Sequence, residues 1–521
     1  MLTYQLDKGA GQSLYVQLYR GIRCDIESGT VASGEKLPSK RALANHLGIS
    51  VITVEGAYGQ LEAEGYIEAR PRCGFFACNV GTSGALSCFP VRETCAVETS
   101  ELCHKLSERK ILADFTGATS PTGIFPYDAW ARTMRQVLAE QDEARLLSSS
   151  DGRGTYQLRC AIANHLRGFR GMEVTPDQVI IGSGAQSLYG LLVQLLGRQR
   201  IFAIENPGYS RLARIYRSHD VPLRLVGLDE KGPLLSQLEE SGASVFHCMP
   251  SHQFPLGITT TVGRRQELLE WAAGGGNRRY LIEDDYDCEF RMAGQPIPPL
   301  QAMDGRECVI YTNTFTKTLG SAFRIGYMVL PPHLARQFQE QLGFYACTVG
   351  ALEQLTLARF IESGQYERHV NRQRTHFRKV QNALVKALGE QQRAAKEGWV
   401  LQLRNVGAGL HFVMEVEAHG GRGSNAGGSG NGGSEVSSGA GSSVGSGGDR
   451  GGETESRRIE ARDIAARALK DGVALSPLDD YWLEGTPQAG ATFVMNLSAL
   501  SEEDAPKAAA VIADAIANCC K

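Results

Sequence analysis

The first sixty residues carry apolar side chains at a helical spacing. From Ser13 to Gly29, leucine and isoleucine recur about every four residues, so they lie on one face of an amphipathic helix that Gly29 ends. A second helix is predicted over residues 40–47 with Ser39 as its N-cap, and Ser50 caps a third. Short helices joined by a turn of this length predict a helix-turn-helix.

After the third helix the pattern changes to the alternation of a strand. Residues 65–76 alternate and turn like a small hairpin, which would form a wing beside the helices. Cations on the second helix and on the wing would meet DNA phosphates while the third helix enters the major groove. The candidate DNA-binding residues are Ser39, Lys40, Arg41, Ser50, Val51, Thr53, Arg70, Arg72 and Gly74.

A helical module that docks on another protein is the alternative for this segment. Residues 1–80 hold eight Lys and Arg against eight Asp and Glu, so the segment is not basic overall. The pattern alone does not choose between DNA binding and docking.

The rest of the chain alternates between strand-length and helical patterns, with two interruptions. Residues 79–110 show no sustained period and are predicted to be a linker between a domain at 1–78 and one at 111–518. Residues 419–455 are nearly all Gly and Ser, and such a segment buries too little apolar surface to fold, so a disordered insertion is predicted there. The expected strands are 179–181, 201–204, 223–226, 245–249, 280–282, 309–311 and 325–330.

This alternation predicts an α/β domain with a mostly parallel, doubly wound sheet. A chain of 521 residues exceeds the length at which a single core keeps growing, so two folded units agree with its size. No apolar run approaches the ~20 residues of a membrane span, and the start does not resemble a secretion signal, so a cytoplasmic protein without membrane contact is expected. Thirteen scattered cysteines without a CxxC pair indicate reduced thiols and no metal site. A net charge of -3 means that any DNA contact comes from a local patch.

Groups with cofactor chemistry follow the ends of several expected strands. In a parallel sheet these ends meet at one edge, where ligands bind. A glycine turn that opens a helix and an arginine suit a phosphate, a carboxylate suits a pyridine nitrogen, and a lysine suits an aldehyde. These three groups occur together in pyridoxal 5'-phosphate. Each motif alone is more often a solvated surface feature, but their joint order favours this cofactor. The residues concerned are Gly184, Ala185, Gln186, Asp284, Tyr286, Thr314, Thr316, Lys317 and Arg324.

Two stretches resemble known families. The run LPSKRALANHLGISVITVEGAYGQLEAEGYI, residues 37–67, resembles the winged helix-turn-helix of GntR-type regulators nearly end to end. It departs at Val51, where the family usually has arginine, and the wing departs at Arg72, where glycine is usual. Both departures bear on the operator and on the affinity for it.

From about Asp114 to Leu500 the chain resembles a fold-type I, class I aminotransferase. The combination with the N-terminal domain resembles the MocR subfamily of GntR regulators, and the PSHQFP run is nearly diagnostic of that fusion. The runs that carry the resemblance are GRG at 152–154, ENPGY at 205–209, PSHQFP at 250–255, EDDYD at 283–287 and TFTKTL at 314–319.

The resemblance implies a role for each candidate of the second domain. Lys317 would hold pyridoxal phosphate as an internal aldimine, and Asp284 would pair with the pyridinium nitrogen. Tyr286 would reach the 3'-oxygen, and Tyr209 would stack on the ring. The remaining cofactor-binding candidates, at the phosphate end, are Gly184, Ala185, Gln186, Thr314, Thr316 and Arg324.

Two departures argue against efficient turnover. Phe254 stands where class I aminotransferases carry an asparagine that donates to the 3'-oxygen, and no late arginine follows Phe493 to bind a substrate carboxylate. Arg211 and Arg404 are the candidates to bind an acidic effector. The interpretation is a homodimeric, DNA-binding transcription regulator that senses an amine or amino acid, or pyridoxal phosphate itself. The alternative is a working aminotransferase that acts on an amino acid and a 2-oxoacid.

Overall fold

The structure is a computed structural model of the chain, and it divides into two units, Met1–Glu108 and Arg109–Lys521. Most of the linker predicted at 79–110 and the insertion predicted at 419–455 lie outside the described residues, so both stay predictions. The described residues are 2–7, 12–80, 111–117, 123–148, 150–274, 278–292, 297–395, 398–418, 460–485 and 490–520.

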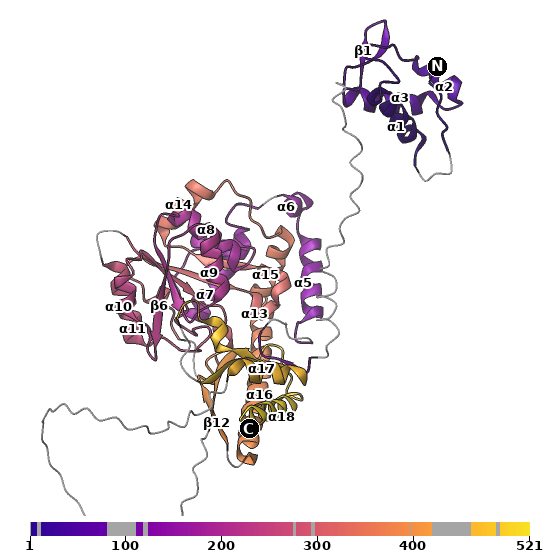
Figure 1. Cartoon of the computed structure of the whole chain (residues 1–521). Coiled ribbons are helices and arrows are strands. Elements are labelled where there is room, and N and C mark those ends of the chain that lie inside the picture. The colour runs from indigo at the N-terminus through magenta and orange to yellow at the C-terminus, as the bar shows by residue number, and fades with distance from the viewer. Residues whose placement is uncertain are drawn as a thin grey trace, which may run out of the picture. The chain divides into compact units, whose positions relative to one another are not determined.

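The first unit packs helices against each other and against a hairpin (Figure 1). The predicted inner residues of the third helix are fully buried. Of those of the first helix, Leu18, Ile22 and Ile26 are buried and Leu14 is half-buried. The winged helix-turn-helix that the sequence predicts is therefore confirmed. Its elements are α1 (Leu14–Glu27), α2 (Lys40–Leu47), α3 (Val51–Ala63), β1 (Ile67–Arg70) and β2 (Gly74–Ala77).

Hydrogen bonds from serine side chains fix where the second and third helices begin. Ser39 Oγ accepts from the N–H of Ala42 at 3.2 Å, and Ser50 Oγ accepts from the N–H of Thr53 at 3.1 Å. Between the two helices Gly48 has φ of 64°, a left-handed conformation that glycine adopts without a steric cost. The caps and this turn set the angle at which α3 leaves α2.

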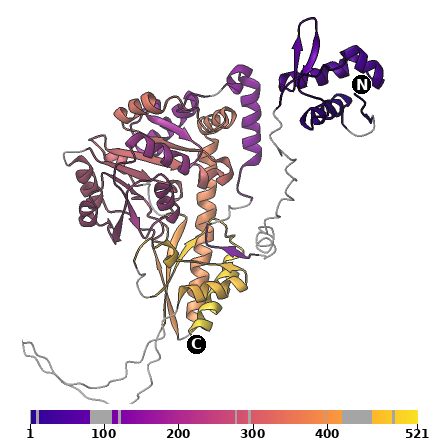
Figure 2. The same cartoon turned by 45° about the horizontal axis from the view of Figure 1, so that its top comes forward.

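The second unit is built on an eight-stranded sheet in the described part of the chain (Figures 1 and 2). The strands β10, β9, β8, β5 and β6 run parallel, whereas β11 is antiparallel to both of its neighbours and β7 is antiparallel to β6. All the strands expected from the sequence are present. Their order across the sheet is β4 (Val179–Gly182), β11 (Gly326–Val329), β10 (Val309–Thr314), β9 (Tyr280–Asp284), β8 (Val245–Cys248), β5 (Phe202–Asn206), β6 (Leu223–Asp229) and β7 (Gly232–Pro233).

Helices cover both faces of this sheet, as the doubly wound prediction requires (Figure 2). Successive strand residues point to opposite sides, so that Ile180 packs into one core and Ile181 into the other. One face is covered by α8 (Ala185–Leu196), α9 (Ser210–Ser218) and α14 (Pro332–Leu342). On the other face, residues of six helices form two apolar clusters: α5 (Tyr127–Glu140), α7 (Tyr156–Arg170) and α15 (Ala351–Glu362) in one, and α10 (Leu235–Glu240), α11 (Val262–Ala273) and α12 (Leu300–Met303) in the other.

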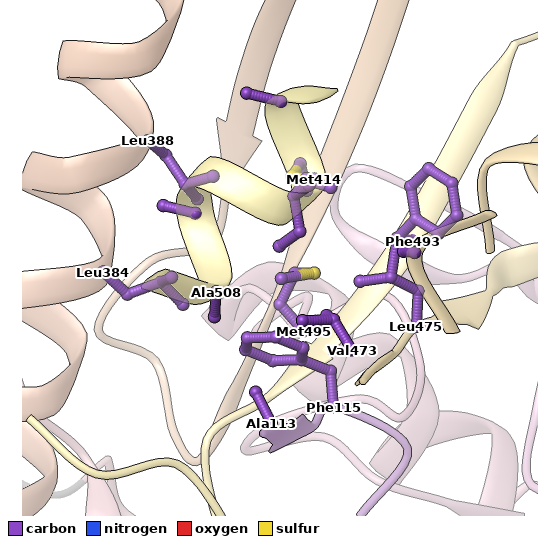
Figure 3. Packing of buried hydrophobic residues seen from close by; sticks show 14 of the residues in the cluster. Ala113, Phe115, Leu384, Leu388, Met414, Val473, Leu475, Phe493, Met495 and Ala508 are labelled. Atoms are coloured by element: carbon purple, nitrogen blue, oxygen red, sulfur yellow. The ribbon is translucent and has the colours of Figure 1, made fainter. Parts of the chain in front are cut away.

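A smaller antiparallel sheet with its own apolar core forms the C-terminal part of this unit. Figure 3 shows Phe115, Leu388 and Met495, from three distant segments, pointing into one cluster. The strand β3 (Ala113–Asp114) pairs with β14 (Val473–Ala474), which joins the start of the unit to this part. The sheet order is β12 (Trp399–Arg404), β13 (His411–Ala418), β16 (Ala491–Asn496) and β15 (Ser476–Pro477), with helices α16 (Gln365–Ala394), α17 (Ala461–Lys470) and α18 (Ala505–Cys519).

Short helical segments complete the connections. They are α6 (Glu143–Leu147), α13 (Thr316–Leu319) and the 3-10 turns η1 (Pro176–Gln178), η2 (Cys288–Phe290), η3 (Ser321–Phe323) and η4 (Leu478–Tyr481). Within the ranges given above, none of the helices combines the length and the apolar character that crossing a membrane requires.

Candidate functional site

The first turn of α3 presents apolar side chains to solvent. Val51 is 40% exposed and Ile52 is 79% exposed, whereas Val54 on the inner face is fully buried. No lysine or arginine occurs between residues 51 and 63. Residues at this end of the second helix of a helix-turn-helix commonly contact base edges, and here this surface is apolar.

Of the four predicted phosphate-binding cations, two form ion pairs within the unit and two do not. Lys40 Nζ lies 2.8 Å from Glu55 Oε1, and Arg70 Nη2 lies 2.5 Å from Glu68 Oε1. Arg41 and Arg72 have no ion pair or hydrogen bond of their side chains within residues 12–80. Because exposed ion pairs are weak in water, phosphates can compete for the first two cations, and the other two are free to bind them.

The turn of the wing contains the residue that departs from the family pattern. Arg70 pairs with Gly74 at the end of the hairpin, and Arg72 lies in the turn between them. Arg72 has φ of 63° and Gly74 has φ of 108°. Both values lie in the left-handed region, so the arginine occupies a conformation that favours glycine.

In the second unit, the topology of the large sheet brings the cofactor-type residues together. Asp284 is the last residue of β9, and it pairs with Thr312 two residues before the end of β10. Lys317 follows in α13, directly beyond that end. On the other side of β10, Gly326 of β11 pairs with Thr314 and with Gly182 of β4.

Gly184, Thr314 and Arg324 form a cradle at the N-terminus of α8. A Cβ at Gly184 would lie 3.4 Å from the Arg324 guanidinium, and one at Gly326 would lie 3.1 Å from Thr314 Cγ2. Arg324 also donates to the carbonyl oxygen of Ser183 at 3.1 Å. The first turn of this 12-residue helix contains Ala185 and the exposed Gln186, and Thr316 begins α13 nearby in the sequence. Free N–H groups and a guanidinium in one place suit a phosphate dianion.

Asp284 is buried in a hydrogen-bond network that the sequence did not predict. The Tyr189 hydroxyl donates to Asp284 Oδ2 at 2.5 Å, and His247 Nε2 lies 3.6 Å from the same oxygen. The Tyr216 hydroxyl lies 2.7 Å from His247 Nδ1 and so fixes that ring. Burial, together with the Asp284 charge, raises the pKa of Tyr189 well above its ordinary value. The tyrosine therefore stays protonated and holds the carboxylate in place.

Burial lowers the pKa of Lys317, and the nearby Asp287 carboxylate opposes that shift. An amine with a lowered pKa is uncharged for a larger part of the time at neutral pH, and only the uncharged amine is a nucleophile. Lys317 is thus chemically suited to attack a carbonyl group.

A buried cluster of His252, Asp287 and His411 lies beside Tyr286. His252 Nδ1 is 2.8 Å from Asp287 Oδ2, and the Tyr286 hydroxyl is 3.2 Å from His252 Nδ1 and 3.5 Å from His411 Nδ1. The same Asp287 oxygen accepts from the N–H of Leu410 at 3.2 Å. These three side chains offer metal-ligand atoms within 4.8 Å of one another. The expectation that the chain has no metal site is not tested by this arrangement.

The sequence named part of this cluster without giving it a role. Asp287 belongs to the EDDYD run and His252 to the PSHQFP run. His411 begins β13 of the smaller sheet, 125 positions after Tyr286, and no local pattern marks it. Tyr189 and His247 face Asp284 from α8 and β8, and only the fold brings them there.

The ring-side and effector candidates differ in where they lie. Burial raises the pKa of Tyr209, with the nearby Arg211 opposing the shift and Asp284 adding to it, and the Arg211 guanidinium lies 5.9 Å from the Tyr209 ring centre. Arg404 lies on β12, with its Nε 2.8 Å from Glu415 Oε2 and about half of its side chain exposed. Arg211 therefore lies beside the ring-side candidate Tyr209, whereas no contact within the described residues joins Arg404 to the other candidates.

Phe254 occupies the position where the family pattern has an asparagine. Its ring centre lies 6.0 Å from that of Tyr209, 5.2 Å from that of His411 and 6.4 Å from that of Tyr286. The side chain is therefore part of the site, and it contributes an apolar surface there instead of an amide donor.

Comparisons with known proteins agree with both halves of this architecture. Residues 14–77 match the family described as bacterial regulatory proteins, gntR family. The chain is 38% identical over 419 residues to the uncharacterized HTH-type transcriptional regulator YdeL of Bacillus subtilis, covering 80% of this chain and 86% of that protein. It is 30% identical over 387 residues to the probable rhizopine catabolism regulatory protein MocR of Rhizobium meliloti, covering 73% and 78%.

Among solved structures, the fold is similar to kynurenine aminotransferase of Pyrococcus horikoshii, with a TM-score of 0.63 and 21% identity, covering 82% of this chain and 95% of that one. Fold and matches together define a DNA-binding transcription regulator with a winged helix-turn-helix and an aminotransferase-like domain. The chain belongs to the MocR-type subfamily of the GntR family.

Proposed function

We propose that the second unit binds pyridoxal phosphate at Lys317, and that this binding, alone or with an amine or amino acid, changes how the first unit binds DNA. The observation that carries the proposal is Lys317, whose pKa is lowered by burial. It follows the end of β10, the strand that pairs with β9, and β9 ends at Asp284. The bound cofactor would supply an aldehyde that links covalently to amines and a ring that withdraws electrons.

The residues present fit this group at each of its polar ends. The cradle of Gly184, Thr314 and Arg324 offers a cation and the N-terminus of α8 to the phosphate, and a Cβ at Gly184 would crowd the guanidinium. At the other end, Asp284 would accept from the pyridine N–H, and Tyr189 would orient the carboxylate.

Tyr286 would donate its hydroxyl proton to the ring oxygen. Its orientation is supported by His252, whose Nδ1 carries a proton because it faces the Asp287 carboxylate at 2.8 Å. Phe254 leaves the ring oxygen without a second donor, which favours binding and signalling over rapid turnover. Arg211, whose guanidinium lies beside the Tyr209 ring, would bind the carboxylate of an acidic effector.

Coupling to DNA requires that the ligand binds two states of the protein unequally. The second part of the proposal is that the protein is a homodimer, because a homodimer has the twofold symmetry that two operator half-sites require. The domain assignment that supports it is a DNA-binding domain at 1–78, a linker at 79–110 and a cofactor domain at 111–518.

The test uses the full-length protein, pyridoxal phosphate and a duplex from the region upstream of its own gene. The wild type is expected to gain a visible absorption band that sodium borohydride abolishes, and its DNA affinity is expected to change when the cofactor is added. Lys317→Ala should show neither effect. Lys386→Ala, which removes an exposed lysine on α16, serves as the control and should behave like the wild type. A Lys317→Ala protein that still responds to the cofactor would overturn the proposal.

Catalysis of amino-group transfer is the competing function, because Lys317 and Asp284 are both in place. Steady conversion of an amino acid and a 2-oxoacid by the wild type, with DNA binding indifferent to the cofactor, would favour it. Slow or absent turnover with a cofactor-dependent DNA affinity would favour the regulatory function.

A further inference from the structure

We infer that α3 reads thymine methyl groups in the major groove through Val51 and Ile52. The inference deepens the role of the first unit, and it rests on DNA binding by that unit and not on the cofactor. Its starting observation is the exposed apolar pair at the helix N-terminus, where Ile52 is 79% exposed and Val51 is 40% exposed. Base-contacting side chains of a helix-turn-helix lie at this position.

Four of the five polar side chains of α3 have a hydrogen-bond partner within residues 12–80, and Glu62, near the C-terminal end of the helix, has none. Thr53 Oγ1 lies 2.8 Å from Ser50 Oγ, which leaves that hydroxyl engaged at the cap. Glu55 accepts from Lys40 at 2.8 Å, and Gln60 donates to Glu64 at 2.5 Å. The side chains of the first turn that remain available to a base edge are therefore Val51 and Ile52.

Along the same helix face, Glu55 is held by Lys40, and the next positions are glycines that leave the helix backbone open to close approach. Gly56 and Gly59 are both exposed, and a Cβ at Gly59 would have no neighbour within 4 Å. A glycine inside a helix costs about 1 kcal/mol of stability relative to alanine, so two glycines weaken α3. Close approach of the helix backbone to a partner is a function that accounts for this cost. Short apolar side chains such as Val51 and Ile52 reach base edges only when the helix backbone comes close.

Unpaired positive charge in the same unit as the apolar surface favours DNA over a protein as the occupant. Arg41 at the start of α2 and Arg72 in the wing turn are exposed and have no side-chain partner within residues 12–80. Two unpaired guanidinium groups in the same unit as an apolar surface match a duplex, which offers phosphates beside its groove.

Thymine is the base that offers an apolar group in the major groove. Its C5-methyl projects into that groove, whereas guanine, cytosine and adenine present hydrogen-bonding atoms there. Arg, Lys and Asn, which read guanine or adenine by paired hydrogen bonds, do not occur between residues 51 and 63, and Gln60, which could read adenine, lies more than two turns beyond the helix N-terminus and donates to Glu64. The chemistry of the recognition helix therefore selects thymine at the positions that face Val51 and Ile52.

The test removes the methyl group without changing any hydrogen bond. Full-length protein first selects bound sequences from a library of random duplexes. Each thymine of a selected duplex is then replaced by deoxyuridine, and affinity is measured by fluorescence anisotropy at fixed salt. At one or two positions of a half-site, the wild type should bind the deoxyuridine duplex about fourfold more weakly, the value expected for one buried methyl group.

The variants assign the effect to a residue. Ile52→Ala should bind the thymine and deoxyuridine duplexes equally at one of these positions, and alanine at an exposed helix site preserves the fold. Val80→Ala, which shortens an exposed valine outside the helix-turn-helix, is the matched control and should keep the full discrimination.

Three results would overturn the inference. In the first, every deoxyuridine duplex binds the wild type as tightly as its thymine parent. In the second, Ile52→Ala discriminates as the wild type does, which would mean that Ile52 does not contact a thymine methyl group. In the third, selection returns no preferred sequence, which would also remove sequence-specific DNA binding from the function. Failure of the cofactor response, by contrast, would leave this inference intact.

Discussion

The two units of the chain differ in where they keep their charges. In the first unit the ion pairs are exposed, as in Arg23–Glu27 and Lys40–Glu55. In the second unit Arg170 and Asp285 form a pair whose side chains are 2% and 1% exposed. Exposed pairs exchange easily with an outside ligand such as a phosphate, whereas buried pairs hold a fixed geometry. The paired charges of the first unit are thus available to a partner, whereas the second unit combines exposed pairs with the buried Arg170–Asp285 pair, which organises the protein itself.

The largest effect expected from this difference comes from two arginines on α7. Arg170→Met should lower the free energy of unfolding by about 3–5 kcal/mol, because it leaves the Asp285 carboxylate buried without its cation. Arg167→Met, which removes an exposed pair with Glu173, should cost less than about 0.5 kcal/mol.

Urea unfolding followed by tryptophan fluorescence makes this measurement on the full chain. It reports only the second unit, because the sequence has four tryptophans and all lie there: Trp130, Trp271, Trp399 and Trp482. Equal costs for the two substitutions would contradict the contrast between buried and exposed charge.

The second prediction concerns pH. Burial raises the pKa of Glu205 to about 8, so the folded protein keeps a proton that the unfolded chain loses above its ordinary pKa. Stability should therefore fall as the pH rises from about 4.5 to about 8, by at most about 1.4 kcal/mol per pH unit for this group. Burial also raises the pKa of Glu283 and of Glu289 to about 7, which adds to the fall up to that pH.

Glu205→Gln should flatten this dependence, because an amide cannot lose a proton. The urea midpoint of the tryptophan signal at several pH values between about 5 and about 8 measures the slope. Glu240→Gln, at an exposed position of α10, should leave the slope as it is in the wild type. An unchanged slope in Glu205→Gln would show that this carboxyl group is ionised in the folded protein.

The first unit should respond to pH in the opposite direction. The hydroxyl of Tyr66 and then the Arg23 guanidinium hold the pKa of Glu27 below its ordinary value. A carboxylate with a lowered pKa stabilises the folded state at neutral pH, and this contribution is lost as the pH falls through the folded pKa. Acid therefore removes the contribution of Glu27 to the DNA-binding unit, whereas a rising pH removes the contribution of Glu205 to the cofactor-type unit.

Much of the fold follows from local patterns in the sequence. The apolar runs give the strands of the large sheet, and the four-residue spacing gives α1 with Leu18, Ile22 and Ile26 in the core. The direction of β11 was not predictable, because an apolar run reads the same in a parallel and an antiparallel strand. The pairing of β3 with β14 was not predictable either, since it joins segments far apart in the chain.

The candidate site was predictable where its residues follow strand ends. Asp284 and Lys317 were named in this way, and the structure brings their strands side by side. Tyr189, His247 and His411 were missed because each reaches the site from another element and lies in no recognisable run. Buried hydrogen-bond partners of this kind depend on tertiary packing, which a local pattern does not encode.

The third prediction concerns the cap that positions the recognition helix. Ser50→Ala removes the hydrogen bond to the N–H of Thr53 and should lower the stability of α3 by about 1 kcal/mol. Ser13→Ala is a matched control, because Ser13 precedes α1 without a capping bond from its side chain. Hydrogen exchange of the amides is measured in α3 for Ser50→Ala and in α1 for Ser13→Ala, each relative to the wild type. A larger increase in α1 than in α3 would contradict the assignment of the caps.

The smallest effect is expected in the wing, where a strained residue carries a free charge. Arg72 has φ of 63°, so Arg72→Gly should relieve the cost of the left-handed conformation. Hydrogen exchange in the hairpin should become slower, corresponding to an increase of at most about 1 kcal/mol in the free energy of opening. The same change removes a cation, and the slope of log affinity for DNA against log salt should fall by about 1. Arg72→Lys keeps both the charge and the strain, so it should retain the wild-type slope and exchange rates. An unchanged slope in Arg72→Gly would mean that this side chain does not contact a phosphate, and the strain would then have no function in DNA binding.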